Sequence, residues 1–190
     1  MKKKLNKTIF LDRDGVINVD SPFYIKSWDE FVFIPGSIEA LRILNENGFD
    51  VILITNQSII NRGMLPQHVL EYIFLMMKSE IESSGGKITD IFFCPHTPEE
   101  GCACRKPLPG LIRKAQKKYE IDISESIMVG DSAKDIQCAM NAGCGTAILV
   151  KTGTEPEARE TLLRESIYPD HIADNLLGAV KWILKKKHLS

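Results

Sequence analysis

Short apolar runs alternate along the chain with longer stretches whose apolar residues recur at helical spacing. The apolar runs have the length of buried strands, and they cover residues 8–11, 51–54, 91–93, 127–129 and 147–150. The stretches between and after them predict helices over residues 37–47, 66–84, 108–119, 134–142 and 174–187. This alternation predicts the α/β class, with a mostly parallel sheet covered by helices on both faces.

The connection between the first strand and the first helix is unusually long, because it runs from Val16 to Pro35. Connections of this length in compact domains are usually functional, so we predict a small flap over residues 16–35. Residues 30–33 within it have the composition of a short strand. No repeat or linker interrupts the 190 residues, which predicts a single domain.

Charge and hydropathy exclude several classes of partner. The 24 Lys/Arg and 25 Asp/Glu residues give a net charge of −1, too balanced to attract nucleic acid or an anionic membrane. No apolar run approaches the ~18 residues of a membrane span, and no signal-peptide pattern follows the first lysines. We therefore expect a soluble, cytoplasmic and monomeric protein whose partner is a small molecule.

Polar side chains follow the ends of the predicted strands. The carboxyl ends of parallel strands share one edge of a sheet, where ligands bind, so these side chains are expected to meet. They are Asp12, Asp14, Thr55, Asn56 and Asp131, with Asp135 one helical turn further and Lys106 before the third helix.

This set of residue types suits phosphoryl transfer. Carboxylates can bind Mg²⁺, which offsets the charge of a phosphate ester, and Lys and hydroxyl groups can hold its oxygens. One carboxylate can attack phosphorus, while a second protonates the leaving alcohol and then activates water. A calcium loop is the competing interpretation of Asp12–Gly15, but Ile17 and Phe23 occupy the positions where an EF-hand needs Gly and Glu.

Four metal-binding residue types gather in one short segment: Cys94, His96, Cys102 and Cys104. Thiolate and imidazole ligands favour Zn²⁺, and four of them fill a tetrahedral structural site. The segment leads directly into Arg105-Lys106, so this zinc loop is expected to hold Lys106 in place. The remaining two cysteines have no such partners and are interpreted as ordinary packing residues.

At these positions the chain resembles the haloacid dehalogenase (HAD) superfamily, whose four motifs occur in order as residues 11–15, 54–58, 105–107 and 129–132. The resemblance implies a Rossmann-like fold with a small flap and no large cap domain. It also implies Asp12 as nucleophile and Asp14 as general acid/base. It implies that Mg²⁺ binds to the side chains of Asp12 and Asp131 and to the backbone carbonyl of Asp14. It also implies that Thr55 and Lys106 hold the phosphoryl group of the substrate.

The zinc loop resembles that of a branch that contains heptose bisphosphate phosphatases and histidinol-phosphate phosphatases, and the heptose members are the closer likeness. This resemblance assigns substrate contacts to Asp20, Asn56, Gln57, Ser58 and Arg105. Residues 59–61, residues 21–23 and Ser132 depart from the pattern usual in the heptose members. These departures lie at expected substrate contacts and not at the catalytic residues. The sequence therefore indicates the reaction class more clearly than it indicates the identity of the substrate.

Two interpretations from other classes are also open. A phosphorelay receiver domain gathers acidic residues, Thr and Lys around a phosphorylated Asp, but its acceptor follows the third strand, which here leads into the cysteine segment. A zinc-knuckle-like nucleic-acid module would use the same cysteines, yet no wider basic surface accompanies them.

Overall fold

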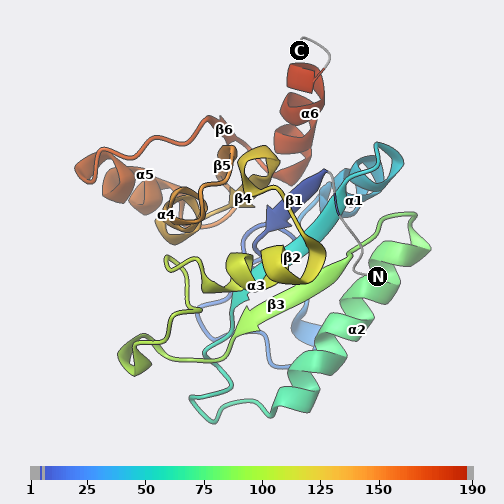
Figure 1. Cartoon of the computed structure of the whole chain (residues 1–190). Coiled ribbons are helices and arrows are strands. Elements are labelled where there is room, and N and C mark those ends of the chain that lie inside the picture. The colour runs from blue at the N-terminus through green and yellow to red at the C-terminus, as the bar shows by residue number, and fades with distance from the viewer. Residues whose placement is uncertain (1–4, 6, 188–190) are drawn as a thin grey trace.

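The computed structural model describes residues 5 and 7–187, and within them six parallel strands form one sheet in the order β3-β2-β1-β4-β5-β6 (Figure 1). The strands are β1 (Thr8–Leu11), β2 (Asp50–Asn56), β3 (Asp90–Cys94), β4 (Ile127–Gly130), β5 (Thr146–Val150) and β6 (His171–Ala173). All the pairings are parallel, including those of β1 with β2 and with β4. The predicted α/β fold class is confirmed.

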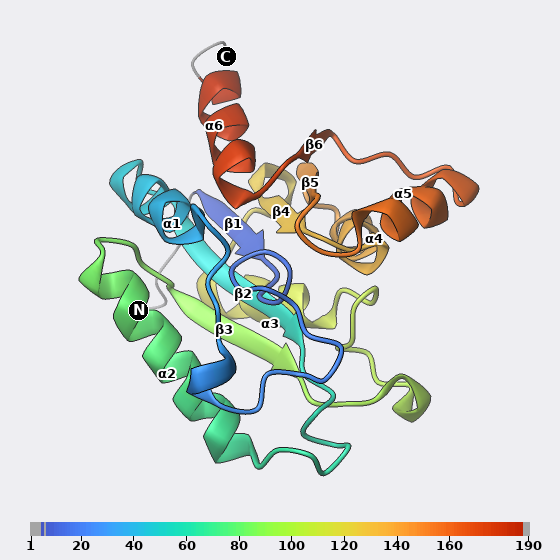
Figure 2. The ribbon, with the colours of Figure 1, turned by 180° about the vertical axis from the view of Figure 1, so that it is seen from behind.

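Helices cover both faces of the sheet, as Figures 1 and 2 show from opposite sides. One face carries α1 (Ser37–Glu46), α2 (Gln67–Ser83) and α6 (Leu176–Lys187). The other face carries α3 (Gly110–Tyr119), α4 (Ala133–Ala142) and α5 (Glu155–Arg164). None of the helices in the described part of the chain is long and apolar enough to cross a membrane.

Strand side chains alternate between two cores. In β1, Ile9 and Leu11 pack with α1, α2 and α6, whereas Phe10 packs with the helices of the opposite face. All three are fully buried, and burying an apolar side chain of this size contributes ~1.5–3 kcal/mol to stability. Burial on both faces explains why the strands are continuous apolar runs in the sequence.

The prediction of a strand over residues 30–33 is wrong. Residues Trp28–Glu30 form a 3₁₀ turn, and Phe33 makes only an isolated bridge to Asn18. The aromatic rings pack against one another instead of alternating: Trp28 stacks on Phe31 with 5.0 Å between centroids, and Phe31 meets Phe33 edge-on at 5.0 Å. This cluster attaches the 16–35 segment beside α2 (Figure 2).

Two regular elements were not predicted. Helix α5 is mostly charged, and its buried contacts come from Ala158 and Leu162, too few to show a clear helical period. Strand β6 is only three residues long and lies at the sheet edge. Both elements follow β5, and the turn between β5 and α5 reaches the carboxyl edge of the sheet.

Candidate active site

The predicted polar residues meet at the carboxyl edge of the sheet, around a cavity of about 680 Å³. Asp12 follows β1, Thr55 and Asn56 end β2, and Asp131 follows β4. The sequence-predicted residues that line the cavity are Asp12, Asp14, Asp20, Thr55, Asn56, Gln57, Arg105 and Asp131. Lys106 and Ser58 are buried next to this set and do not line the cavity themselves.

Lys106 lies between two carboxylates. Its Nζ is 2.7 Å from Asp12 Oδ2 and 2.5 Å from Asp135 Oδ1, and its side chain is 2% exposed. Burial alone would lower the pKa of Lys106, but the two carboxylates raise it above its usual value, so the ammonium is charged. The cation therefore reaches the predicted nucleophile directly.

Asp135 is the functional residue whose role the sequence left open. Its Oδ2 accepts hydrogen bonds from the backbone N–H and the hydroxyl of Ser132, at 3.1 and 2.6 Å, which caps α4. Its other oxygen faces Lys106. The spacing of Ser132 and Asp135 is that of a capping box, and this was the available sequence signal for a residue fixed at the start of a helix.

The carboxylates of Asp12, Asp131 and Asp135 present oxygens within 4.8 Å of one another. Burial, followed by the charges of neighbouring aspartates, raises the pKa of Asp12 to about 7 and that of Asp131 to about 8. Asp12 and Asp131 line the cavity, whereas Asp135 is fully buried behind it, so Asp12 and Asp131 are the side chains that a cation in the cavity can reach. Crowded oxygen ligands of this kind fit a hard divalent ion.

Asp14 is held by side chains on its inner side. Arg13 donates three hydrogen bonds to its carboxylate, and Gln57 Nε2 and Asn18 Nδ2 donate one each, at 2.8 and 2.9 Å. Burial opposes ionisation of Asp14, but Arg13 outweighs that effect and holds the pKa of the carboxyl below its usual value. Sequence reasoning missed Arg13, since a lone Arg between two catalytic candidates gives no pattern of its own.

Gly15 permits a close approach of this turn to Asp131. Its φ of +75° lies in the left-handed region, and a Cβ at this position would be 2.5 Å from Asp131 Cγ. On the other side of Asp131, the backbone N–H of Thr154 faces Oδ2 at 3.4 Å, and the Thr152 hydroxyl donates to the Gly15 carbonyl. These threonines come from the turn before α5, which the sequence did not single out.

The residues after β2 connect the cavity to the cysteine segment. Asn56 exchanges two hydrogen bonds with the backbone of Lys106, through Oδ1 at 3.1 Å and Nδ2 at 3.2 Å. Gln57 donates to the Thr55 hydroxyl at 2.9 Å, and its own backbone N–H donates to the Cys94 carbonyl. Asn56 and Gln57 thus hold catalytic candidates in addition to lining the cavity.

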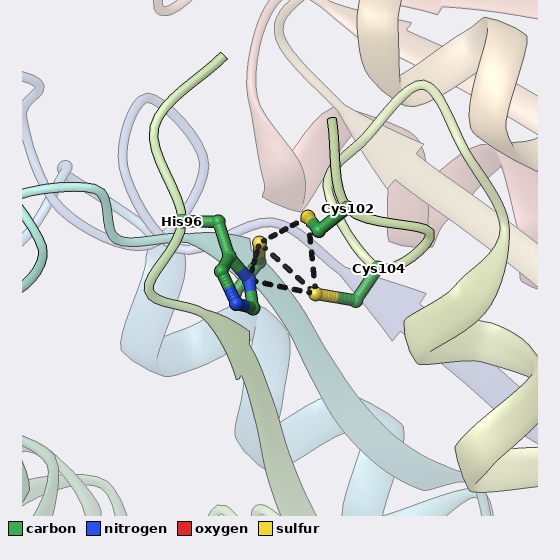
Figure 3. Close-up of side chains that lie close together, drawn as sticks. His96, Cys102 and Cys104 are labelled. Atoms are coloured by element: carbon green, nitrogen blue, oxygen red, sulfur yellow. Dashed lines mark hydrogen bonds between the residues drawn. The ribbon is translucent and has the colours of Figure 1, made fainter. Parts of the chain in front are cut away.

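Cys94, His96, Cys102 and Cys104 converge, as Figure 3 shows for the labelled residues. The Sγ atoms lie 3.2–3.5 Å apart, and His96 Nδ1 is 3.5 Å from Cys94 Sγ and 3.3 Å from Cys104 Sγ. These separations approach the edges of a tetrahedron around a metal with ~2.3 Å bonds to sulfur. The His96 carbonyl accepts a hydrogen bond from Arg105 at 3.0 Å, which joins the cluster to the cavity wall.

Comparisons with known proteins agree with this geometry. A model of the HAD-hydrolase-like family matches residues 103–179. The D-glycero-β-D-manno-heptose-1,7-bisphosphate 7-phosphatase of Bordetella bronchiseptica is 44% identical over 182 residues, which cover 95% of this chain and 99% of that protein. The α-anomer enzyme of Photorhabdus laumondii is 37% identical over 85% of this chain and 93% of its own.

A solved structure resembles the whole fold. The crystal structure of D,D-heptose 1,7-bisphosphate phosphatase from B. bronchiseptica, complexed with magnesium and phosphate, superposes with a TM-score of 0.87. The two sequences are 38% identical in that comparison, which covers 95% of this chain and 99% of the other.

Proposed function

The chain belongs to the HAD-like hydrolases and, within them, to the family of the D-glycero-D-manno-heptose-1,7-bisphosphate 7-phosphatases, and from this premise we propose that it removes the 7-phosphate of such a heptose bisphosphate. The observation that carries the proposal is the likeness to relatives of that name over 95% of the chain. Relatives named for the β and for the α anomer both match, so the proposal covers both anomers.

In the first step, a carboxylate oxygen of Asp12 attacks phosphorus, and the bond from phosphorus to the sugar oxygen breaks. Because Arg13 keeps the carboxyl of Asp14 ionised before substrate binds, Asp14 must first take up a proton, which it then gives to that leaving oxygen. Lys106, 2.7 Å from Asp12, and the Thr55 hydroxyl hold phosphoryl oxygens while charge moves onto them.

In the second step, water attacks the phosphoaspartate, Asp14 accepts its proton, and the Asp12–phosphorus bond breaks to release inorganic phosphate. Mg²⁺ held by Asp12, Asp131 and the backbone carbonyl of Asp14 would neutralise phosphate charge in both steps. The carboxylate oxygens that crowd around Asp12 and Asp131 support this ligand set.

The cysteine cluster fits a structural Zn²⁺ ion. Three thiolates and one imidazole fill a tetrahedral site and leave no open position for substrate. Three links join the cluster to the active site. The Gln57 backbone N–H donates to the Cys94 carbonyl, the Arg105 side chain donates to the His96 carbonyl, and the chain itself runs from Cys104 to Lys106.

Substrate recognition is proposed for Asp20, Asn56, Gln57, Ser58 and Arg105. Four of them line the cavity, while Ser58 is buried behind it. The relatives described above are named for heptose bisphosphates, which favours that substrate over histidinol phosphate. Histidinol phosphate is therefore the competing substrate in the activity test that closes the Discussion. A single domain, a monomeric state and a cytoplasmic location stay predictions, and size-exclusion chromatography tests the second.

The nucleophile is tested with Asp12→Asn. Phosphate release with Mg²⁺ should fall below detection, because an amide does not form the phosphoaspartate, and the circular dichroism spectrum should be unchanged. Asp29→Asn, at an exposed position of the 16–35 segment, is the matched control and should retain full activity. Turnover by Asp12→Asn within tenfold of the wild type would remove Asp12 from the nucleophile role.

A further inference from the structure

Arg13 is a buried cation beside the reaction centre. It stands between Asp12 and Asp14 in the sequence, and its side chain is 2% exposed. The guanidinium carbon lies 5.7 Å from the ring centroid of Phe74 on α2, over the ring face. Burying an Arg costs the free energy of removing its charge from water, a cost that an ion pair at the surface would avoid. Its burial therefore calls for a role that depends on a fixed position.

Arg13 holds the carboxylate of Asp14 with the planar fork of its guanidinium. Nη2 is 2.6 Å from Oδ1 and 2.8 Å from Oδ2, and Nε is 3.1 Å from Oδ1. Such a fork fixes the plane of a carboxylate as well as its distance, which a lysine cannot do. Gln57 and Asn18 add one hydrogen bond each.

The other side of Asp14 remains available to the cavity. Its side chain is 20% exposed and lines the cavity next to Asp12. A general base must lie within hydrogen-bond reach of the water it activates, and a misplacement of about 1 Å can reduce the rate about 10²-fold. A carboxylate anchored from behind and open in front meets that requirement.

We propose that Arg13 is a positioning residue that fixes Asp14 for the breakdown of the phosphoaspartate. The proposal rests on the proposed function, in which Asp14 takes the proton of the attacking water. The bond from the water oxygen to phosphorus forms, the Asp12–phosphorus bond breaks, and the proton moves to the Asp14 oxygen that faces the cavity. In this role Arg13 acts through the carboxylate of Asp14, to which it donates three hydrogen bonds.

The test uses p-nitrophenyl phosphate and rapid-mixing kinetics. This leaving group departs without a general acid, so loss of the base slows only the second step. Asp14→Asn and Arg13→Met should both give a burst of p-nitrophenol followed by slow turnover, with phosphoenzyme accumulating. For Arg13→Met the slow phase should be about 10²-fold below the wild-type rate. Arg13→Lys keeps the charge without the fork, so the rate of its slow phase should lie between those of the wild type and Arg13→Met.

Coupling between the variants distinguishes positioning from a general loss of structure. Arg13→Met in the Asp14→Asn background should slow turnover no further, because the group that Arg13 holds is already gone. Arg42→Met removes an exposed Arg that pairs with Glu46 on α1, and it should leave the kinetics unchanged. Arg13→Lys supplies the same readout if Arg13→Met does not fold.

Three results would overturn the proposal. An unchanged kcat with a raised KM in Arg13→Met would make Arg13 a substrate ligand. A double variant at least tenfold slower than Asp14→Asn alone would show that Arg13 acts by another route. Wild-type kinetics in Asp14→Asn itself would remove the base role of Asp14, and this outcome alone would also contradict the proposed function.

Discussion

Asp12, Lys106 and Asp135 form a row of alternating charges that leads from the cavity wall into the protein interior. Lys106 Nζ lies within 2.7 Å of both carboxylates, and the side chains of Lys106 and Asp135 are almost fully buried. In a low-dielectric site, such a cation both holds the nucleophile and prevents mutual repulsion of the carboxylates. In the proposed mechanism, the same atom also holds the phosphoryl group.

Lys106→Met should destabilise the fold and abolish turnover. It leaves two buried carboxylates without their cation, a change that typically costs about 3–5 kcal/mol. Urea unfolding measures the loss. Lys118→Met is the matched control, since Lys118 pairs with Asp90 at the surface with 56% of its side chain exposed, and its loss should cost at most about 1 kcal/mol. Equal losses in the two variants would contradict the buried-pair account.

The carboxylates also predict a pH-dependent effect of Mg²⁺. The pKa values of Asp12 and Asp131 are raised to about 7 and about 8, mainly by burial and also by neighbouring carboxylates. A raised carboxyl pKa stabilises the metal-free fold below the unfolded value of 3.8, and this contribution is lost as the pH rises through the folded value. Mg²⁺ binds the ionised forms, so protons compete with it at low pH.

Thermal unfolding with and without Mg²⁺ tests this competition. Mg²⁺ should increase the free energy of unfolding only slightly at pH 5.5 and more at pH 8, where the increase should approach ~2.7 kcal/mol at a Mg²⁺ concentration of 100 Kd. Asp131→Asn should lose most of the gain at pH 8. The same gain at both pH values would contradict the assignment of the ion to these carboxylates.

The convergence of the candidate carboxylates and Lys106 could be predicted because each stands at a recognisable boundary of an element. Arg13 could not, because its partner Asp14 is its neighbour in the sequence and its burial depends on Phe74, 61 positions further along the chain. The contacts of Thr152 and Thr154 with the Gly15–Asp131 region were likewise inaccessible, since the turn that carries them precedes a helix with almost no hydrophobic pattern.

At the scale of elements, the loop between β3 and α3 organises one wall of the site. Together with Cys94 at the end of β3, this loop carries the Cys/His cluster, continues through Arg105 and Lys106, and is fixed to the end of β2 by the two hydrogen bonds of Asn56. A metal in the cluster would therefore restrict the position of Lys106 through a short covalent path.

Cys102→Ser should release the metal and loosen this loop. Bound zinc should fall from one ion per chain to none, and hydrogen exchange over residues 94–106 should accelerate, while turnover keeps its dependence on Mg²⁺. Cys144→Ser, at a half-buried cysteine outside the cluster, should retain the zinc. Activity that zinc restores without Mg²⁺ would instead indicate a catalytic zinc.

Strands were predicted correctly where burial on both faces of the sheet requires a continuous run of apolar residues, as in β1, β2 and β4. Prediction failed for residues 30–33 because apolar composition does not distinguish a strand from a turn whose aromatic rings pack together. It also missed α5 and β6, since an edge element with few buried residues carries little periodic signal.

At the scale of the molecule, the sheet order brings the ends of β1, β2 and β4 together around one cavity. Asp20 and Tyr24 of the 16–35 segment also line that cavity, as does Thr154 from the turn before α5. The sheet edge thus supplies the proposed catalytic residues, while loops of different origin supply the rest of the cavity wall.

The central claim is tested most directly by phosphate release with Mg²⁺ from a panel of substrates. The panel contains the heptose 1,7-bisphosphates of both anomers, the heptose 7-phosphate, histidinol phosphate, and several hexose and triose phosphates. We predict that a heptose 1,7-bisphosphate gives a kcat/KM at least about 10²-fold above every non-heptose ester, with the 1-phosphate left on the product. Preference for histidinol phosphate, or no release from any ester, would contradict the account.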